Sequence, residues 1–261
     1  MSSDKPLSAR LFLLKEMVVR DLRSRYAGSG LGVLWAFALP VLWMFLYTAV
    51  FAVILRAPVE KGYASFPEFL MAGLLPWMAI SEGISRSSSA LTDNAAMVKK
   101  TVFPIETLIL SVILAAVVNQ VIGFLVYAVY VALVGHFSLP WALLALPALV
   151  LQVLLTFGIG CIAATVTTFL RDAAQAISIG LTVIFWATPI VYPAALVPAR
   201  FRPILAANPI THLTEWYRRA FTLHTLPDAG SALYLIVCAA AAAAVGTAIF
   251  FRARPHFADL I

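Results

Sequence analysis

The sequence is poor in charge and nearly without cysteine, and both shortages narrow the class of protein. Only 11% of the 261 residues are charged, against about 25% in an ordinary soluble domain. With 62% hydrophobic residues there is no room for a sizeable soluble domain, so we predict an integral membrane protein. Cys161 and Cys238 lie inside apolar runs and are interpreted as small buried residues without a metal or redox role.

The motifs of common catalytic sites are absent as well. The chain has no GxxxxGK[ST] loop, so it is not expected to bind ATP, and it has no HExxH, CxxC or GxSxG motif. Glu82 alone makes a poor proton or sodium site, and we interpret it as an inner-end helix residue with a local partner. The scattered histidines are interpreted as loop or interface residues: His136, His212, His224 and His256. We therefore predict no enzyme, no metal and no cofactor bound by this chain.

Long apolar runs are what the sequence has in abundance. A bilayer core of about 30 Å needs about 20 apolar residues in a helix, and the uncharged run at 27–55 meets that need. The polar start has no signal-peptide layout, so the first span is expected to remain as an anchor. We predict an all-α protein with a single transmembrane domain over 1–261 and six spans, at about 34–55, 69–88, 108–133, 141–166, 177–192 and 231–251.

Lysine and arginine set the expected orientation. Twelve of the 18 fall on the side that carries both termini, and the positive-inside rule places that side in the cytoplasm. Because the cations flank spans, the net charge of +6 indicates orientation and anionic lipid rather than nucleic acid. Four arginines argue against this orientation because they cluster in one segment assigned to the outside: Arg200, Arg202, Arg218 and Arg219.

The stretch at 7–26 is typical of a helix lying in the membrane interface. Its apolar residues recur at helical spacing with basic residues among them: Leu7, Leu11, Leu14, Val18 and Leu22. A hinge of Gly28, Ser29 and Gly30 joins it to the first span. An interfacial helix hinged to a span predicts a part that moves at the cytoplasmic surface of a transporter component.

Two connections between spans leave alternatives open. The segment at 193–227 is rich in proline yet largely apolar, so it is either a pair of re-entrant half-helices or an ordinary loop on the outer surface. In the inner connection at 93–104, Asp93 or Asn94 is expected to cap a short helix that presents an apolar and charged surface. That surface either docks on a partner or is part of a solvated turn.

Aromatic residues are plentiful, and they too have two interpretations. Tryptophan and tyrosine form belts at both membrane interfaces in many membrane proteins. Alternatively, some of them line a path and stack against the C–H faces of sugar rings.

The sequence resembles the membrane subunit of an ABC exporter of the type-2 superfamily, and most closely the exporters of O-antigen, capsule or teichoic-acid chains. The resemblance covers nearly the whole chain. It rests on RDLRSRYAGSGLGVLWAFALP at 20–40, NAAMVKKTVFPIE at 94–106, FLRDAAQAISIGLTVIFWATPIVYP at 169–193, NPITHLTEWYRRAF at 208–221 and FADLI at 257–261.

The resemblance implies a role for each predicted segment. The helix that ends at Arg25 and Tyr26 would be a gate at the cytoplasmic entrance, where Arg20, Arg23 and Arg25 receive the pyrophosphate of a polyprenyl-linked substrate. Half-helices around 198–221 would close the outer mouth. The channel would be lined by Trp35, Tyr47, Phe185, Trp186 and Tyr192, and the coupling helix that contacts the ATPase would include Asp93, Asn94, Met97, Val98, Lys99 and Lys100.

The resemblance also implies partners and a location. Two copies of the chain would pair in the bacterial inner membrane above two separate ATPase subunits, which would bind ATP and Mg. The substrate would be a lipid-linked polysaccharide. The alternatives are a type-2 exporter of a drug, lipid or peptide, and a membrane scaffold that transports nothing.

Overall fold

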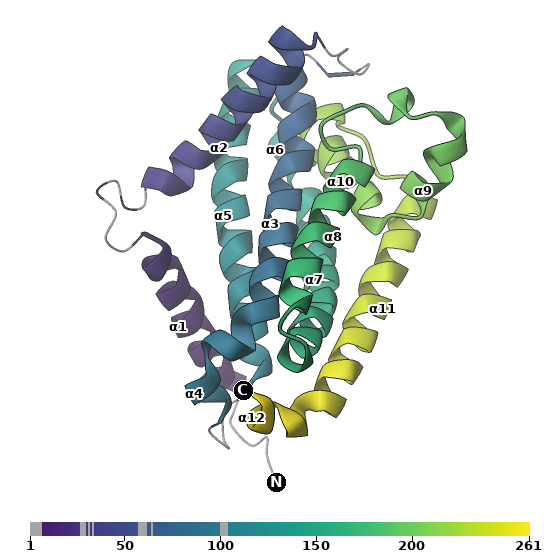
Figure 1. The fold of residues 1–261 in the computed structure, drawn as a ribbon. Helices are drawn as coiled ribbons and strands as arrows, with labels where there is room; N and C mark the ends of the chain where they lie inside the picture. The colour runs from purple at the N-terminus through teal and green to yellow at the C-terminus, as the bar shows by residue number, and fades with distance from the viewer. Residues whose placement is uncertain are drawn as a thin grey trace.

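The computed structural model describes residues 7–26, 30, 32, 34–56, 62–63, 65–99 and 104–261, and over these ranges it is helical with no strand. Figure 1 shows long helices gathered in one bundle, with short helices at both ends. The helices are α1 (Leu7–Tyr26), α2 (Leu34–Tyr47), η1 (Thr48–Ile54), α3 (Phe66–Asp93), α4 (Ala95–Val98), α5 (Glu106–Leu133), α6 (Leu139–Ala142), α7 (Ala145–Phe169), α8 (Ala173–Ala187), η2 (Ala194–Leu196), η3 (Ala199–Phe201), α9 (Arg202–Ala206), α10 (Pro209–Arg218), η4 (Arg219–Leu223), α11 (Ala229–Ala253), η5 (Arg254–His256) and α12 (Phe257–Leu260).

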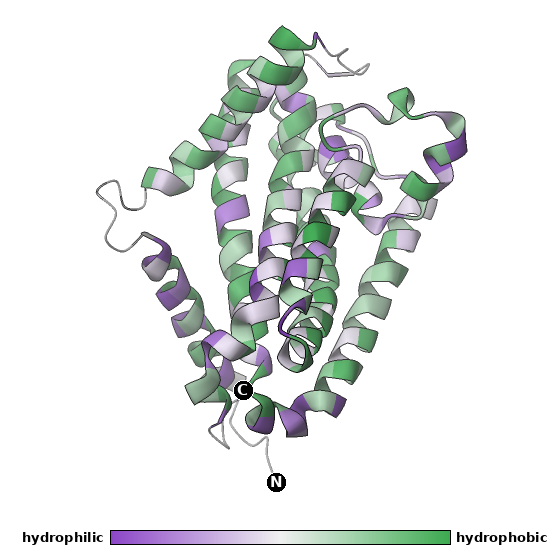
Figure 2. Ribbon diagram, viewed as in Figure 1, coloured by the Kyte–Doolittle hydropathy of each residue, from purple (hydrophilic) through white to green (hydrophobic). Residues whose placement is uncertain are grey.

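Within the described residues, four helices are long and apolar enough to cross a membrane. They cover Leu34–Ile54, Glu106–Leu133, Leu139–Phe169 and Ala229–Leu260, and Figure 2 shows the hydrophobic colour running along them. Of the two other predicted spans, α3 has 28 residues but carries polar and charged side chains, and α8 has 15 residues. The count of six spans therefore stays a prediction.

Helix α8 ends earlier than the sequence predicted. It stops at Ala187, whereas the predicted span ran to residue 192. Thr188 adopts an extended conformation (φ −105°, ψ 135°), and Pro189 follows it. A residue before proline is driven out of the helical region by contact with the proline ring, which explains the early end.

Helix α3 forms the centre of the bundle. It packs against α5, α7, α10 and α8, and Leu70, Ile80 and Leu91 along its length have no exposed surface. Its buried Ser87 donates a hydrogen bond to the carbonyl of Gly83, 2.6 Å away. A hydroxyl bonded within its own helix can be buried without losing a hydrogen bond, so α3 tolerates the serines in its C-terminal half.

Helices α7 and α11 cross at two glycines. A Cβ added to Gly158 would lie 2.1 Å from the carbonyl oxygen of Ala242, and one added to Gly246 would lie 2.0 Å from that of Gly158. Only glycine allows backbones to approach this closely, as in other membrane helix pairs with small residues at the crossing.

One end of the bundle brings together segments from both ends of the chain. Met17 of α1, Val98 of α4 and Phe257 of α12 are buried in one apolar cluster. Figure 1 shows α1, α4 and α12 at the same end. The first and last described helices therefore meet at the same end of the bundle.

The segment at 193–227 folds into short helices at the opposite end. Arg218 is buried and donates hydrogen bonds to the carbonyls of Phe69 (3.2 Å), Pro189 (2.8 Å) and Ile190 (3.0 Å). Tyr217 is buried too and reaches Gln152 of α7 at 2.8 Å. These contacts place α10 among the long helices, whereas the re-entrant arrangement itself stays a prediction.

Candidate functional site

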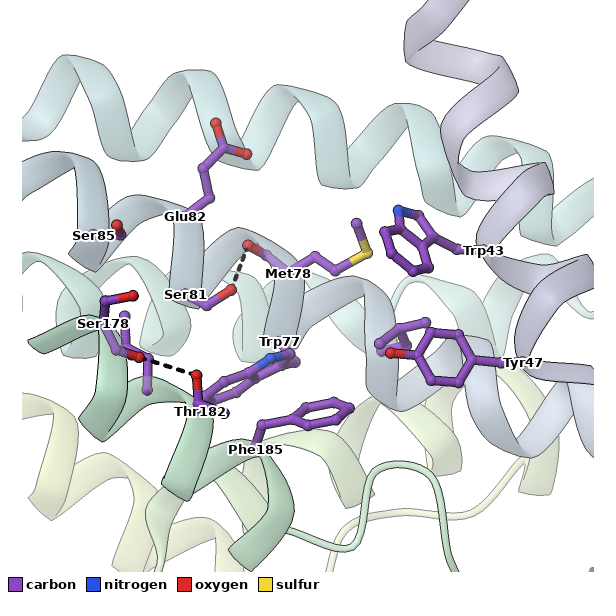
Figure 3. A pocket seen from close by; sticks show the side chains of 12 residues that line it. Trp43, Tyr47, Trp77, Met78, Ser81, Glu82, Ser85, Ser178, Thr182 and Phe185 are labelled. Atoms are coloured by element: carbon purple, nitrogen blue, oxygen red, sulfur yellow. Dashed lines mark hydrogen bonds between the residues drawn. The ribbon is translucent and has the colours of Figure 1, made fainter. Parts of the chain in front are cut away.

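A cavity of about 520 Å³ lies between α2, α3 and α8. Figure 3 shows aromatic rings gathered at one end of it and hydroxyl groups at the other. Its lining consists of Trp43, Tyr47, Leu74, Trp77, Met78, Ser81, Glu82, Ser85, Ser178, Leu181, Thr182 and Phe185.

Helical periodicity explains which residues reach this cavity. The α3 lining residues are spaced by three or four positions from 74 to 85, and those of α8 likewise from 178 to 185. Residues at this spacing share one face of a helix. Trp43 and Tyr47 are also four residues apart on α2, with ring centroids separated by 5.7 Å.

The aromatic end joins three helices. The rings of Trp77 on α3 and Phe185 on α8 have centroids 5.8 Å apart, and Tyr47 of α2 points toward Phe185 across the cavity (Figure 3). Such rings offer flat apolar faces to a ligand.

The hydroxyl end offers acceptors. Ser81 donates its proton to the carbonyl of Met78 and Thr182 to that of Ser178, each at 3.1 Å. Since each hydroxyl has one proton and two lone pairs, these oxygens keep acceptor capacity beside the cavity. Glu82 is the charged residue of the lining.

Two of the five aromatics predicted to line a channel, Tyr47 and Phe185, line this cavity, whereas Trp35, Trp186 and Tyr192 are not in its lining. The Trp186 side chain is 56% exposed, because it lies one position along the helix from Phe185 and so points in a different direction. Tyr192 donates a hydrogen bond to the carbonyl of Trp186 at 2.7 Å.

Sequence reasoning did not select Trp43 and Trp77, which line the same cavity. The four-residue spacing of Trp43 and Tyr47 is a signal that identifies the first. No local signal identifies Trp77, since its position depends on how α3 packs beside α8.

Below the cavity, α1 and α3 are joined by a cluster of two carboxylates and two guanidinium groups. Arg25 pairs with Asp21 on its own helix (Nε to Oδ2, 3.0 Å) and with Glu82 on α3. Arg86 pairs with both carboxylate oxygens of Asp21, with Nη1 at 2.8 Å from Oδ2, and lies 3.6 Å from Glu82. We call these four residues the ion cluster.

The ion cluster keeps Asp21 ionised. Burial alone raises the pKa of this carboxyl, but the hydrogen bonds and charges of Arg86 and Arg25 outweigh burial and hold the pKa below its ordinary value. The interpretation of Glu82 as a residue with a local partner is confirmed, because Arg86 lies four residues along the same helix and pairs with it.

The predicted entrance residues fall into different environments. Arg25 belongs to the ion cluster, whereas Arg20 donates a long, 3.5 Å hydrogen bond to Asn94. Arg23 is exposed. The side chain of Tyr26 lies outside the described residues. Sequence reasoning did not select Asp21 and Arg86, because they are brought together only by the packing of two helices.

The predicted coupling segment contains a short helix, α4, and Asn94 occupies its N-cap position, but no side-chain capping bond forms. Asn94 donates instead to the carbonyl of Ala90 (2.9 Å), and Asp93 accepts from Ser89 (2.7 Å). Both side chains turn back along α3.

The apolar residues of this segment face inward. Val98 is buried in the apolar cluster that also contains Met17 and Phe257, and Met97 packs partly buried against that cluster. The exposed residues of the segment include Asp93, Ala96 and Lys99, whereas Lys100 lies outside the described residues. Any surface offered to a partner is therefore more polar than the sequence suggested.

Comparison with known proteins places this architecture in a family. The model of the family described as ABC-2 type transporter matches residues 13–222. The chain is 32% identical to the O-antigen export system permease protein RfbA of Myxococcus xanthus, over 95% of both chains. It is 30% identical to RfbA of Klebsiella pneumoniae, over 95% of both. It is 24% identical to the polysialic acid transport protein KpsM of Escherichia coli, over 91% of this chain and 92% of KpsM. The match over most of the chain, together with apolar helices long enough to cross a membrane, shows that this protein is a multi-pass membrane subunit of the ABC-2 type transporter family.

Proposed function

We propose that this chain is the membrane subunit of an ATP-driven exporter that moves a lipid-linked polysaccharide out of the cytoplasm. Its relatives with full-length matches are named for O-antigen export and polysialic acid transport. The observation that carries the proposal is the cavity between α2, α3 and α8, with aromatic rings at one end and hydroxyl groups at the other.

The lining of this cavity suits a sugar chain. Sugar rings have C–H faces that stack on aromatic planes and hydroxyl groups that donate to acceptors. Trp43, Tyr47, Trp77 and Phe185 supply the planes, and Ser81 and Thr182 supply acceptor oxygens. Uncharged contacts of this kind are individually weak, which allows a long polymer to advance through the site.

A separate subunit supplies the energy in this proposal. Membership of the family implies an ATPase partner, which would hold ATP and Mg. The short helix α4 is the surface on which it would dock, with Lys99 exposed beside it. Two copies of this chain and two of the ATPase would form the exporter in the bacterial inner membrane, with α1, α4 and α12 at the cytoplasmic side.

Helix α3 provides a direct route from this docking surface to the cavity. It runs without interruption from Asp93, beside α4, to Trp77 in the aromatic end of the cavity. Movement of α4 on ATP binding would therefore shift the cavity lining. The helices α9 and α10 would close the outer mouth.

The test is extraction of this chain from its native membranes in mild detergent, followed by mass spectrometry of its partners and by assay of surface polysaccharide after deletion of its gene. We expect a stoichiometric P-loop ATPase and loss of the polysaccharide. An ATPase partner with an unchanged cell surface would favour a type-2 exporter of a drug, lipid or peptide. Absence of an ATPase from a folded preparation would favour the alternative of a membrane scaffold that transports nothing.

A further inference from the structure

The structure separates the four arginines that argue against the expected orientation into two kinds. Arg218 is buried and donates to backbone carbonyls, and Arg219 pairs with Glu215, with Nε 3.2 Å from Oε1. Arg200 and Arg202 are exposed instead, and among the described residues no carboxylate forms an ion pair with either. Two guanidinium groups at the end of the bundle opposite α1, α4 and α12 can therefore meet an anion from outside the chain (Figure 1).

These two arginines belong to an exposed, largely apolar stretch at 194–206, which we call the arginine segment. Most of its residues are exposed, whereas Leu205 is buried. Its large apolar side chains Leu196, Phe201 and Ile204 have 57%, 44% and 59% of their surface exposed. Exposed apolar side chains beside arginines are typical of a segment in the membrane interface, where the apolar groups enter the acyl chains and the guanidinium groups stay at the headgroups.

The level of the arginine segment in the membrane follows from its contact with α11. Tyr234, in the second turn of α11, donates a hydrogen bond of 2.7 Å to the carbonyl of Ala207, directly after the segment. Helix α11 begins the apolar stretch Ala229–Leu260, which is long enough to cross a membrane, so its first turns lie at the boundary of lipid and water. Figure 1 shows α9, in which the segment ends, beside these turns. The segment therefore lies at the level of the phospholipid headgroups.

We propose that the arginine segment binds anionic phospholipids of the leaflet at this end, with Arg200 and Arg202 on the phosphate groups and its exposed apolar side chains among the acyl chains. A guanidinium group offers several donors in a fork that matches phosphate oxygens. Arg202 uses its Nε on the carbonyl of Val197, 3.4 Å away, and the guanidinium carbon of Arg200 lies 4.6 Å from the ring centroid of Phe201. Both side chains keep terminal N–H donors for a headgroup.

The bound lipid also holds the ends of two helices in place. Asn208, two residues after the segment, caps α10 by accepting from the backbone N–H of Ile210 at 3.0 Å. The same side chain donates to Thr188 at the end of α8, 2.8 Å away. A headgroup at the arginine segment is thus connected through a few residues to both α8 and α10. This inference does not rest on the proposed function, because contact with a phospholipid surface is independent of what the chain transports.

Insertion is tested on the full chain in lipid nanodiscs, with both native cysteines replaced by alanine and a bimane fluorophore attached at Ile204→Cys. Phospholipids that carry a nitroxide quencher near the headgroup are expected to quench this fluorophore strongly. Thr225→Cys is the comparison, since Thr225 is an exposed polar residue in the connection before α11, and its fluorophore should be quenched less. Equal quenching at the two positions, or none at Ile204→Cys, would overturn the proposal.

Selectivity for anionic lipid is tested with the same fluorophore. Phosphatidylglycerol and phosphatidylcholine with the same quencher are compared, and we expect the relative binding constant of phosphatidylglycerol to be about fivefold or more, since each basic residue near an anionic surface adds about that factor. Replacing Arg200 and Arg202 together by glutamine should bring the ratio to about one, whereas replacing both by lysine should keep most of it.

Arg171→Gln is the matched control, because Arg171 is exposed and precedes α8 at the end of that helix far from the arginine segment. It should leave the ratio unchanged. A ratio near one in the wild type, or an equal loss with Arg171→Gln, would refute the lipid site. Absence of quenching together with oxidative joining of two Ile204→Cys chains would assign this surface to a contact between copies. Neither measurement uses the ATPase or a polysaccharide, so its failure would leave the proposed function untouched.

Discussion

Trp77 of α3 and Phe185 of α8 lie with ring centroids 5.8 Å apart and planes inclined by 38°, so that the two helices present one continuous aromatic surface to the cavity. Phe185→Ala removes half of that surface. Because an aromatic contact contributes about 1 kcal/mol beyond its buried area, we expect polysaccharide export to fall about fivefold, as measured by surface polysaccharide at equal protein levels.

The neighbouring Trp186→Ala is the comparison for this prediction. Trp186 points away from the cavity and is 56% exposed, so its removal is expected to change export less than Phe185→Ala does. A larger loss with Trp186→Ala would place the sugar path outside this cavity.

The crossing of α7 and α11 predicts a second outcome. Gly158→Val places atoms on top of the Ala242 carbonyl, which lies 2.1 Å from the position of the first added carbon. The helices must separate, at a cost of about 1–3 kcal/mol or more, and the melting temperature in detergent should fall. Gly180→Ala is the control, because a Cβ there meets nothing within 4 Å, and alanine is the better helix former. Equal melting temperatures for the two variants would contradict the close crossing.

Local patterns in the sequence were sufficient to predict the helices. The apolar run at 34–55 became α2 and η1, and the interfacial stretch became α1 with the predicted bounds, 7–26. Hydropathy and helical spacing depend only on neighbouring residues, which explains this agreement. The early end of α8 also has a local cause, since Pro189 lies inside the span that was predicted to continue.

The site was predicted only in part, because its remaining members depend on tertiary packing. Tyr47 and Phe185 were identified, whereas Trp77 reaches the cavity only through the position of α3 beside α8. Likewise Asp21 and Arg86 are 65 residues apart in the chain. Single residues can be selected from a sequence by their chemistry, but their partners are set by which helix faces meet.

The buried amides between α5, α7 and α10 predict a third outcome. Tyr217 donates to Gln152 at 2.8 Å, and the side chains of Gln152 and Gln120 bond each other at 2.6 and 3.0 Å. Tyr217→Phe leaves the two glutamines paired and should lower the free energy of unfolding by about 1 kcal/mol. Gln152→Leu removes the bonds that Gln152 makes with both Gln120 and Tyr217. It should therefore lower the free energy of unfolding by more, about 1–3 kcal/mol. Thermal unfolding in detergent gives the ranking, and the opposite order would contradict this network.

The ion cluster predicts a dependence on pH. The folded protein lowers the pKa of Asp21 below the ordinary value of 3.8. Its carboxylate therefore contributes stability in full above about that value, and the contribution is lost as the pH falls through the lowered pKa. We expect the melting temperature of the wild type to exceed that of Asp21→Asn at neutral pH. The two melting temperatures, plotted against pH, should converge below pH 3.8. Glu16→Gln should follow the wild type throughout. A constant difference between wild type and Asp21→Asn down to the lowest pH would contradict this role of the carboxylate.

The end of the chain predicts an effect on coupling. Phe257 is fully buried, with its ring centroid 5.2 Å from that of Phe250, in the cluster that also contains Val98 of α4. Arg254 lies 3.6 Å from Glu106, just after the coupling segment. The C-terminal helix thus supports α4 from within the bundle. Phe257→Ala removes that support, so the ATPase can displace α4 without also moving α3.

The expected result is a lower ratio of polysaccharide exported to ATP hydrolysed, measured in vesicles that contain the complete exporter. Phe257→Leu, which fills much of the same volume, should restore most of the ratio. Phe251→Ala is the matched control, since Phe251 is 48% exposed on the neighbouring turn. If Phe257→Ala lowers export and ATP hydrolysis in the same proportion, the cluster serves stability alone. A selective loss of export would show that the buried contact between α12 and α4 transmits the movement of the ATPase, because a stability defect reduces both activities together.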